Sequence, residues 1–183
     1  MKVLAISGSL RKDSYNTRLL EAAEEVIGDR ADIESFDIGK IPHYHGDQDG
    51  ETKPQAVQEL LDAIASADGL LIATPEYNYS LPGVLKNAID WASRPAYKSV
   101  LKGKPTAILS ASISATGGVR AQVHLRDILA GTLTPVLHAP DFLVPTAQHK
   151  FDETGKLTDE PTQQMLERRM GEFLGWVEGH QQA

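Results

Sequence analysis

The 183-residue chain contains no cysteine. Without thiols it forms no disulfides, no thiolate zinc sites and no cysteine-ligated iron–sulfur clusters. A cysteine nucleophile is excluded on the same ground. The chemistry of this chain must therefore rest on other side chains or on a bound organic molecule.

Long apolar runs and an excess of positive charge are also missing. The longest apolar run is only a few residues, so we expect no membrane-spanning helix. The start, MKVLAISGSLRK, breaks into Ser-Gly-Ser too early for a signal peptide, and we expect a cytoplasmic protein. The formal charge of −7 argues against a general binder of nucleic acid or anionic membrane.

Short apolar runs alternate with amphipathic stretches, without linker or repeat, so we expect one domain over residues 1–183. The periodicity predicts strands at 2–6, 33–38, 69–73, 106–109 and 135–137. It predicts helices at 19–27, 57–65, 82–91, 119–129 and 166–177. This alternation is typical of an α/β three-layer sandwich, and five parallel strands favour the flavodoxin-like order 2-1-3-4-5.

Such a sheet binds ligands beyond the carboxyl ends of its strands, at the switch point between strands one and three. The functional residues are therefore expected in segments 7–18, 74–80 and 110–118. Each segment taken alone is also compatible with an ordinary turn. Their shared position at one edge of the sheet favours a single ligand that touches all three.

The first segment is rich in hydroxyl groups and leads into a helix. A phosphate there would meet free backbone N–H groups and the positive end of the helix dipole, with Arg11 as a charged donor. The GxGxxG and Walker patterns are absent, which favours one phosphate of a mononucleotide over a pyrophosphate. The alternative is that these residues only cap the helix.

The other two segments suit a flat ring. Consecutive amides and Asn78 supply polar partners for a ring edge, and Tyr77 supplies a flat surface. The small residues of segment 110–118 allow a ligand to approach the backbone closely.

Three motifs, GSLRKDSYNTRLL, PEYNYSLPGVLKNAIDWASRP and SASISATGGVRAQVHLR, resemble those of the NADPH-dependent FMN reductases. That family includes bacterial quinone, chromate and azo-dye reductases. The second motif is the most specific, and the resemblance covers about residues 1–145 in order.

The resemblance implies a flavodoxin-like fold and non-covalent FMN. By motif position, the FMN phosphate would be held by Ser9, Arg11, Ser14, Asn16 and Thr17. The isoalloxazine ring would be lined by Pro75, Glu76, Tyr77 and Asn78. The other side of the site would be closed by Ser112, Gly117 and Gly118. Asp13 departs from the small residue of many relatives, and its carboxylate opposes a phosphate unless it pairs with Lys12 or Arg18.

The implied reaction is hydride transfer from NADPH or NADH to flavin N5 and then to a small acceptor, in ping-pong order. Quinones, chromate, azo or nitro compounds and free flavin are candidate acceptors, and no catalytic side chain is required. Since cysteine is absent, the electrons must pass through the organic cofactor. A flavodoxin-type electron carrier without its own NAD(P)H oxidation is the alternative, but flavodoxins usually have a Thr-rich phosphate loop without this arginine.

The 39–54 segment contains HYHGDQDG, whose spacing misses the EF-hand pattern, and we expect no metal. In relatives this segment approaches the flavin, which implies His43 or Tyr44 as substrate contacts. Arg94 is a further candidate, for an anionic donor or acceptor. Relatives form homodimers or homotetramers, and we expect the same here, through the third helix and the 39–54 segment.

Overall fold

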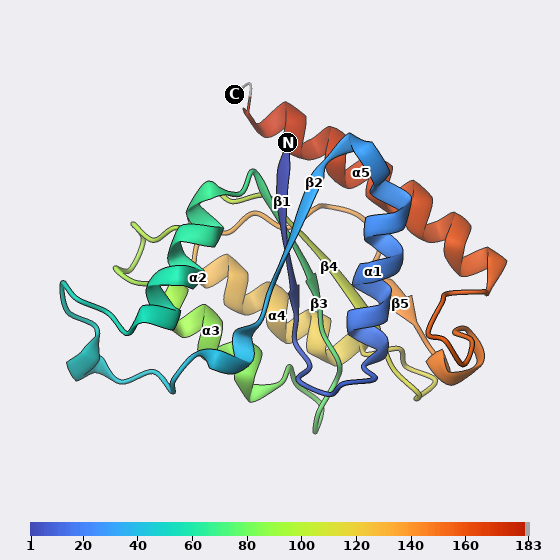
Figure 1. The fold of residues 1–183 in the computed structure, drawn as a ribbon, viewed down its shortest axis with the longest axis horizontal. Coiled ribbons are helices and arrows are strands. Elements are labelled where there is room, and N and C mark those ends of the chain that lie inside the picture. The colour runs from blue at the N-terminus through green and yellow to red at the C-terminus, as the bar shows by residue number, and fades with distance from the viewer. Residues whose placement is uncertain (182–183) are drawn as a thin grey trace.

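The computed structural model describes residues 1–181, in which strands and helices alternate (Figure 1). The strands are β1 (Lys2–Ser7), β2 (Asp32–Phe36), β3 (Gly69–Ala73), β4 (Thr106–Ala111) and β5 (Phe142–Val144). The longer helices are α1 (Tyr15–Ile27), α2 (Gln55–Ser66), α3 (Gly83–Ala92), α4 (Val119–Gly131) and α5 (Glu160–Gln181). Single 3₁₀ turns lie at Gly28–Arg30, Ile38–Lys40, Gly46–Gln48 and Ala147–His149.

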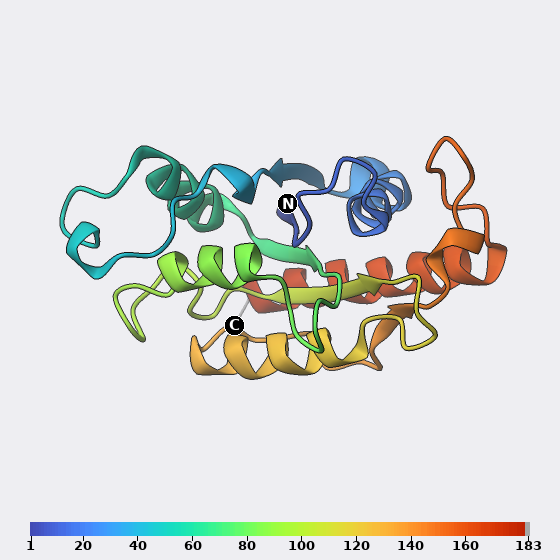
Figure 2. The same cartoon turned by 90° about the horizontal axis from the view of Figure 1, so that it is seen from below.

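The sheet has five parallel strands in the order β2-β1-β3-β4-β5, which confirms the predicted flavodoxin-like fold. Helices α1 and α5 cover one face, and α2, α3 and α4 cover the other (Figures 1 and 2). All five residues of β3 are buried, as its unbroken apolar run predicts for a central strand. No helix among residues 1–181 has both the length and the apolar character needed to cross a membrane.

The predicted fifth strand at 135–137 is wrong. That segment forms only an isolated bridge between Val136 and Thr106. The chain then leaves the ladder through Pro140, which has no N–H to donate, and β5 pairs with β4 from Phe142 onward. The second strand also ends earlier than predicted, because Ile38 begins a 3₁₀ turn that Asp37 caps through Gly39 N–H.

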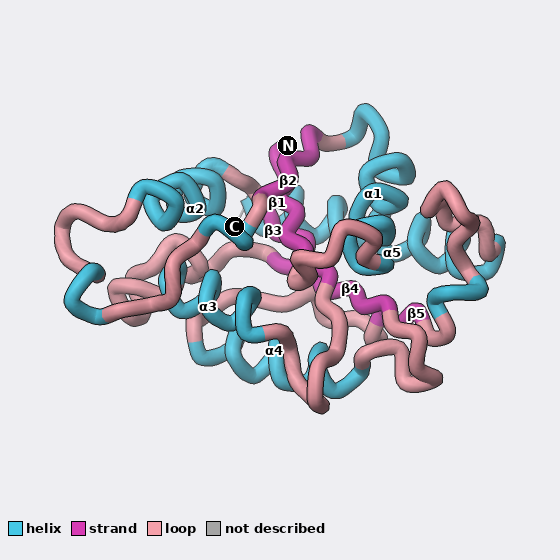
Figure 3. Tube along the Cα trace, turned by 60° about the horizontal axis from the view of Figure 1, so that its bottom comes forward, coloured by secondary structure: helices cyan, strands magenta, loops and turns pink. Residues whose placement is uncertain are grey.

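The carboxyl ends of β1, β3 and β4 lie at one edge, which Figure 3 brings toward the viewer. Three connections follow these ends: the first loop (residues 8–14), the second loop (74–82) and the third loop (112–118). The switch point between β1 and β3 therefore lies beneath these loops, as expected for this strand order.

Candidate functional site

The first loop ends in a well-capped helix. Ser14 is buried, and its Oγ accepts from the backbone N–H groups of Asn16 (3.2 Å) and Thr17 (3.4 Å). Thr17 Oγ1 lies 2.8 Å from Ser7 Oγ, so this hydroxyl secures the end of β1. Arg11 N–H donates to Ser9 Oγ at 3.3 Å, which curls the loop and leaves the Arg11 guanidinium exposed.

Asp13 is neutralised within this loop. Its carboxylate pairs with Arg18 at 3.1 Å, one of the two partners that the sequence offered. The Arg18 guanidinium in turn lies directly against Gly155, where a Cβ would meet it at 1.0 Å. Residues 151–157, which form a short hairpin closed by a bridge between Phe151 and Leu157, thus pack against the arginine that pairs with Asp13.

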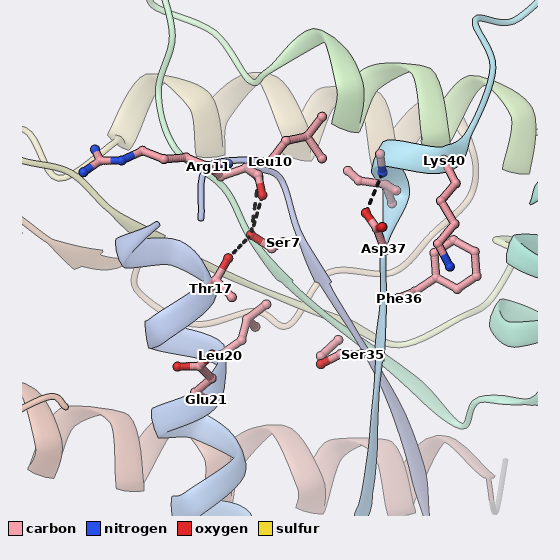
Figure 4. Close-up of a pocket in the computed structure, with 14 residues that line it drawn as sticks. Ser7, Leu10, Arg11, Thr17, Leu20, Glu21, Ser35, Phe36, Asp37 and Lys40 are labelled. Carbon is pink, nitrogen blue, oxygen red and sulfur yellow. Dashed lines mark hydrogen bonds between the residues drawn. The ribbon is translucent and has the colours of Figure 1, made fainter. Parts of the chain in front are cut away.

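A cavity of about 630 Å³ opens beside the first loop, between α1 and the end of β2 (Figure 4). Ser9, Arg11 and Thr17 line it together with residues after β2, and Arg11 and Lys40 extend at opposite ends of it. Residues of the second and third loops are not among its lining. The cavity therefore extends the phosphate side of the predicted site, while the ring side is an open surface.

The second loop is a tight turn fastened to α4. Tyr77 and Ser80 exchange backbone hydrogen bonds of 2.9 and 3.1 Å, and Asn78 and Tyr79 between them have φ of 50° and 68°. Glu76 accepts from Arg120 twice, from its backbone N–H and its Nη1, both at 3.0 Å. The carboxylate caps the start of α4 and pairs with a cation at once, which is a favourable place for an anion.

Tyr77 and Tyr79 project from this turn and are 51% and 65% exposed. The Arg120 guanidinium lies 4.3 Å from the centre of the Tyr79 ring, a cation–π contact that holds it. Tyr77 has no such partner within residues 1–181 and presents a free aromatic surface beside the switch point. Pro75 is buried behind it.

The third loop depends on two glycines. Gly117 and Gly118 have φ of 62° and 90°, and Cβ atoms there would lie 3.0 Å from Leu143 and Ser110. A side chain at either position would therefore point into the protein and clash, so the tight path of this loop requires glycine. Above them, the hydroxyls of Ser112, Ser114 and Thr116 form an exposed chain with oxygen separations of 3.0 and 2.9 Å.

Two of the three candidate substrate residues, Tyr44 and Arg94, belong to a separate cluster. Tyr44 packs edge-on against Trp91 with ring centres 4.9 Å apart, and its hydroxyl donates to Asp49 at 3.2 Å. Arg94 donates to the same carboxylate at 3.2 Å, whereas His43 is exposed. Among residues 1–181, no hydrogen bond or ion pair joins this cluster to the three loops.

Asp49 is the centre of that cluster, with Lys53 as a third donor and a side chain only 9% exposed. Burial by itself would raise the pKa of Asp49, but hydrogen bonds from Lys53, Arg94 and Tyr44 outweigh it and lower the pKa below its ordinary value of 3.8. The cluster is therefore built around an ionised carboxylate.

Sequence reasoning missed Arg120 and Asp49 as organising residues. Arg120 stands inside the third quoted motif, and Asp49 stands in the 39–54 segment, where only His43 and Tyr44 were named as candidate contacts. No local pattern predicts the pairing of Glu76 with Arg120 or of Asp49 with Arg94, since the partners are 44 and 45 residues apart.

The sequence matches the model of the NADPH-dependent FMN reductases over residues 1–149. It is 44% identical over 177 residues to an NAD(P)H-dependent FMN reductase of Pseudomonas aeruginosa, covering 97% of this chain and 95% of that one. It is 40% identical over 177 residues to a 2-hydroxy-1,4-benzoquinone reductase of a Burkholderia species, covering 97% and 96%. FerB of Paracoccus denitrificans, a flavoenzyme NAD(P)H:(acceptor) oxidoreductase, has a similar structure, with a TM-score of 0.90, 36% identity and 98% of each chain covered. The chain therefore belongs to the NADPH-dependent FMN reductase family.

Proposed function

We propose that this chain uses bound FMN to reduce quinones with electrons from NAD(P)H. The family match and the two reductase relatives support this activity. The main observation behind the proposal is that the three loops that contain the family motifs lie together at one edge of the sheet. Asn16 joins the start of α1, directly after the first loop, to the end of β4, and Glu76 joins the second loop to the helix that follows the third.

The first loop fits the phosphate of FMN. The Ser9 and Ser14 hydroxyl protons and the Arg11 guanidinium meet no acceptor in the part of the chain that the structure describes, so all three remain available as donors. The first turn of α1 carries no acidic residue, and Asp13 is already paired. We assign phosphate binding to Ser9, Arg11 and Ser14, with Thr17 ordering the end of β1 through its contact with Ser7.

The second and third loops would hold the ring. Tyr77 and the backbone around Asn78 would meet its face and edge, with Pro75 as a rigid support. Glu76 would orient this loop through Arg120 and present no free carboxylate to the ring. On the opposite side, Ser112 would offer its hydroxyl, and Gly117 and Gly118 would offer their backbone.

When bound, FMN supplies hydride transfer between NAD(P)H and the acceptor. The exposed ring side suits a donor and an acceptor that enter in turn, and we expect ping-pong kinetics. Quinones are the primary acceptors in this proposal, with chromate, azo and nitro compounds and free flavin as further small acceptors. His43, Tyr44 and Arg94 stay predicted acceptor contacts, the last two oriented by Asp49.

We also propose that residues 1–183 form a single domain of a cytoplasmic homodimer or homotetramer. The supporting features are the packing of α5 on the same sheet as α1 and the exposed 39–54 segment beside α3.

Purified protein should be yellow, and anaerobic NADPH should bleach the flavin absorbance. Steady-state NADPH and NADH oxidation with a benzoquinone then measures turnover and donor preference. A protein that binds FMN but is not bleached by either donor would be the electron-carrier alternative. A colourless protein that takes up no added FMN would contradict the proposal altogether.

A further inference from the structure

The side chain of Asn16 is not free. It is 3% exposed, its Nδ2 donates to the Ala111 carbonyl at 2.9 Å, and its Oδ1 accepts from the Ala111 N–H at 2.9 Å. One amide thus satisfies both backbone groups of a residue 95 positions away. Buried backbone groups need such partners, so breaking this pair would be costly.

The location of Ala111 explains why it needs this partner. The last register pair between β3 and β4 joins Ala73 to Leu109, and the chain then turns away at Pro75. Ala111 lies two residues further along β4, where β3 no longer offers an N–H or a C=O. The Asn16 amide occupies that place and extends the ladder by one residue pair.

A second buried amide holds the preceding residue. Gln122, which is fully buried, donates from Nε2 to Ser110 Oγ and to the Phe142 carbonyl, each at 2.8 Å. Ser110 Oγ donates to the Gly117 carbonyl at 2.6 Å. The end of β4, from which the third loop departs, is therefore held by α1 through Asn16 and by α4 through Gln122.

We propose that Asn16 is a positioning residue that locks the start of α1, directly after the first loop, to the end of β4, directly before the third loop, and that its side chain does not bind phosphate itself. The inference rests on the proposed FMN site, whose phosphate side and ring side lie on these two loops. Asn16 is the second residue of α1, next to the Ser14 cap, and Ala111 directly precedes Ser112. The lock sets the spacing between the two sides, so it acts on the whole flavin rather than on its phosphate.

Riboflavin separates the two roles, because it carries the ring without the phosphate. Asn16→Ala should lower the affinities for FMN and for riboflavin by the same factor, on the order of tenfold. Arg11→Ala should lower the affinity for FMN by a similar factor and leave the affinity for riboflavin within about twofold of wild type. Both affinities are measured by quenching of flavin fluorescence on titration with apoprotein.

Asn87→Ala is the matched control for the loss of a buried amide. Asn87 also bridges backbone groups, accepting from Tyr44 N–H at 2.8 Å and donating to the Pro42 carbonyl at 3.0 Å, but it holds the 39–54 segment. Asn87→Ala should destabilise the protein about as much as Asn16→Ala does, and it should leave both flavin affinities within about twofold of wild type. Asn16→Ser, a milder change, provides the same comparison if the alanine variant does not fold.

Hydrogen–deuterium exchange gives a readout independent of flavin. The third loop should exchange faster in the Asn16 variants, and the 39–54 segment should exchange faster in Asn87→Ala. If Asn16→Ala lowered the affinity for FMN and left that for riboflavin unchanged, Asn16 would be a phosphate ligand and the proposal would be overturned. Unchanged affinities for both flavins, or an equal loss in Asn87→Ala, would also overturn it. Failure of wild type to prefer FMN over riboflavin would instead count against the proposed phosphate loop.

Discussion

Two carboxylates of the predicted FMN site and one of the separate cluster around Tyr44 are each paired with an arginine. Asp13 pairs with Arg18, Glu76 with Arg120, and Asp49 with Arg94. A chain with a net charge of −7 that binds an anionic cofactor and an anionic donor gains from such pairing, because free carboxylates at the site would repel both. The first two pairs also hold a loop to a helix, and the third joins the 39–54 segment to the residues after α3, so each pair contributes to shape as well as to charge.

Asp49 predicts a pH dependence of stability. Its pKa is lower in the folded protein than in the unfolded chain, so its stabilisation is complete above the ordinary carboxyl range and is lost as the pH falls through the folded-state pKa. Asp49→Asn should lower the urea midpoint at pH 7 and flatten its decline below about pH 4. Asp47→Asn removes an exposed carboxylate of the same segment and should preserve that decline. Parallel pH profiles for Asp49→Asn and wild type would contradict the assignment.

At the scale of elements, glycine is required in the turn before α4 but is unfavourable on the exposed face of α5. Gly118 occupies the N-cap position of α4 with φ of 90°, where a side chain is strained and would meet Ser110. Gly175 lies in the interior of α5, is exposed, and would place a Cβ in open space. The same substitution should therefore have opposite effects at the two positions.

Gly118→Ala should lower the free energy of unfolding by about 1–3 kcal/mol, through backbone strain and the contact with Ser110. Gly175→Ala should raise it by about 0.5–1 kcal/mol, because alanine loses less conformational entropy in a helix. Urea denaturation of the two variants measures both changes. A loss of stability in Gly175→Ala would mean that this face of α5 is covered by something outside the chain.

At the scale of the molecule, α5 is part of the core although it lies beyond the residues that the family model matches. Its buried stripe packs against α1 and the sheet, and a Cβ at Gly69 would lie 2.9 Å from Val177 and 3.2 Å from Phe173. The helix therefore sits unusually close to β3, the central strand beneath the site.

Phe173→Ala should lower the free energy of unfolding by about 3–5 kcal/mol, because it leaves a cavity in the core. The variant should still unfold in a single cooperative transition, as expected if residues 1–183 form one domain. Trp176, a larger but only half-buried residue on the same helix, is the control. Trp176→Ala should lower the free energy of unfolding by less than Phe173→Ala does. Calorimetry or urea unfolding tests both. Separate transitions for α5 and the rest of the chain would contradict the single-domain prediction.

Local patterns in the sequence predicted most of the strands and the position of the three loops, and the flavodoxin-like winding then gave the strand order. The unbroken apolar runs of β1, β3 and β4 mark buried parallel strands, and the loops must follow their carboxyl ends. The fifth strand was misplaced because the apolar stretches around Val136 and Phe142 read alike, and only pairing with β4 separates a bridge from a strand. The roles assigned to the site residues stay predictions.

Residue type and periodicity thus predicted the elements, because these depend on near neighbours along the chain, and the winding preference for five parallel strands supplied their order and the edge at which we expect a ligand. The distant partners of Asn16, Glu76 and Asp49, which are Ala111, Arg120 and Arg94, were decided only by folding. Each joins segments about 45 or more residues apart, and each depends on where a strand ends or a loop turns. Asn16 shows the difference: its motif suggested a phosphate ligand, yet the end of β3 leaves Ala111 unpaired and draws the amide to the backbone.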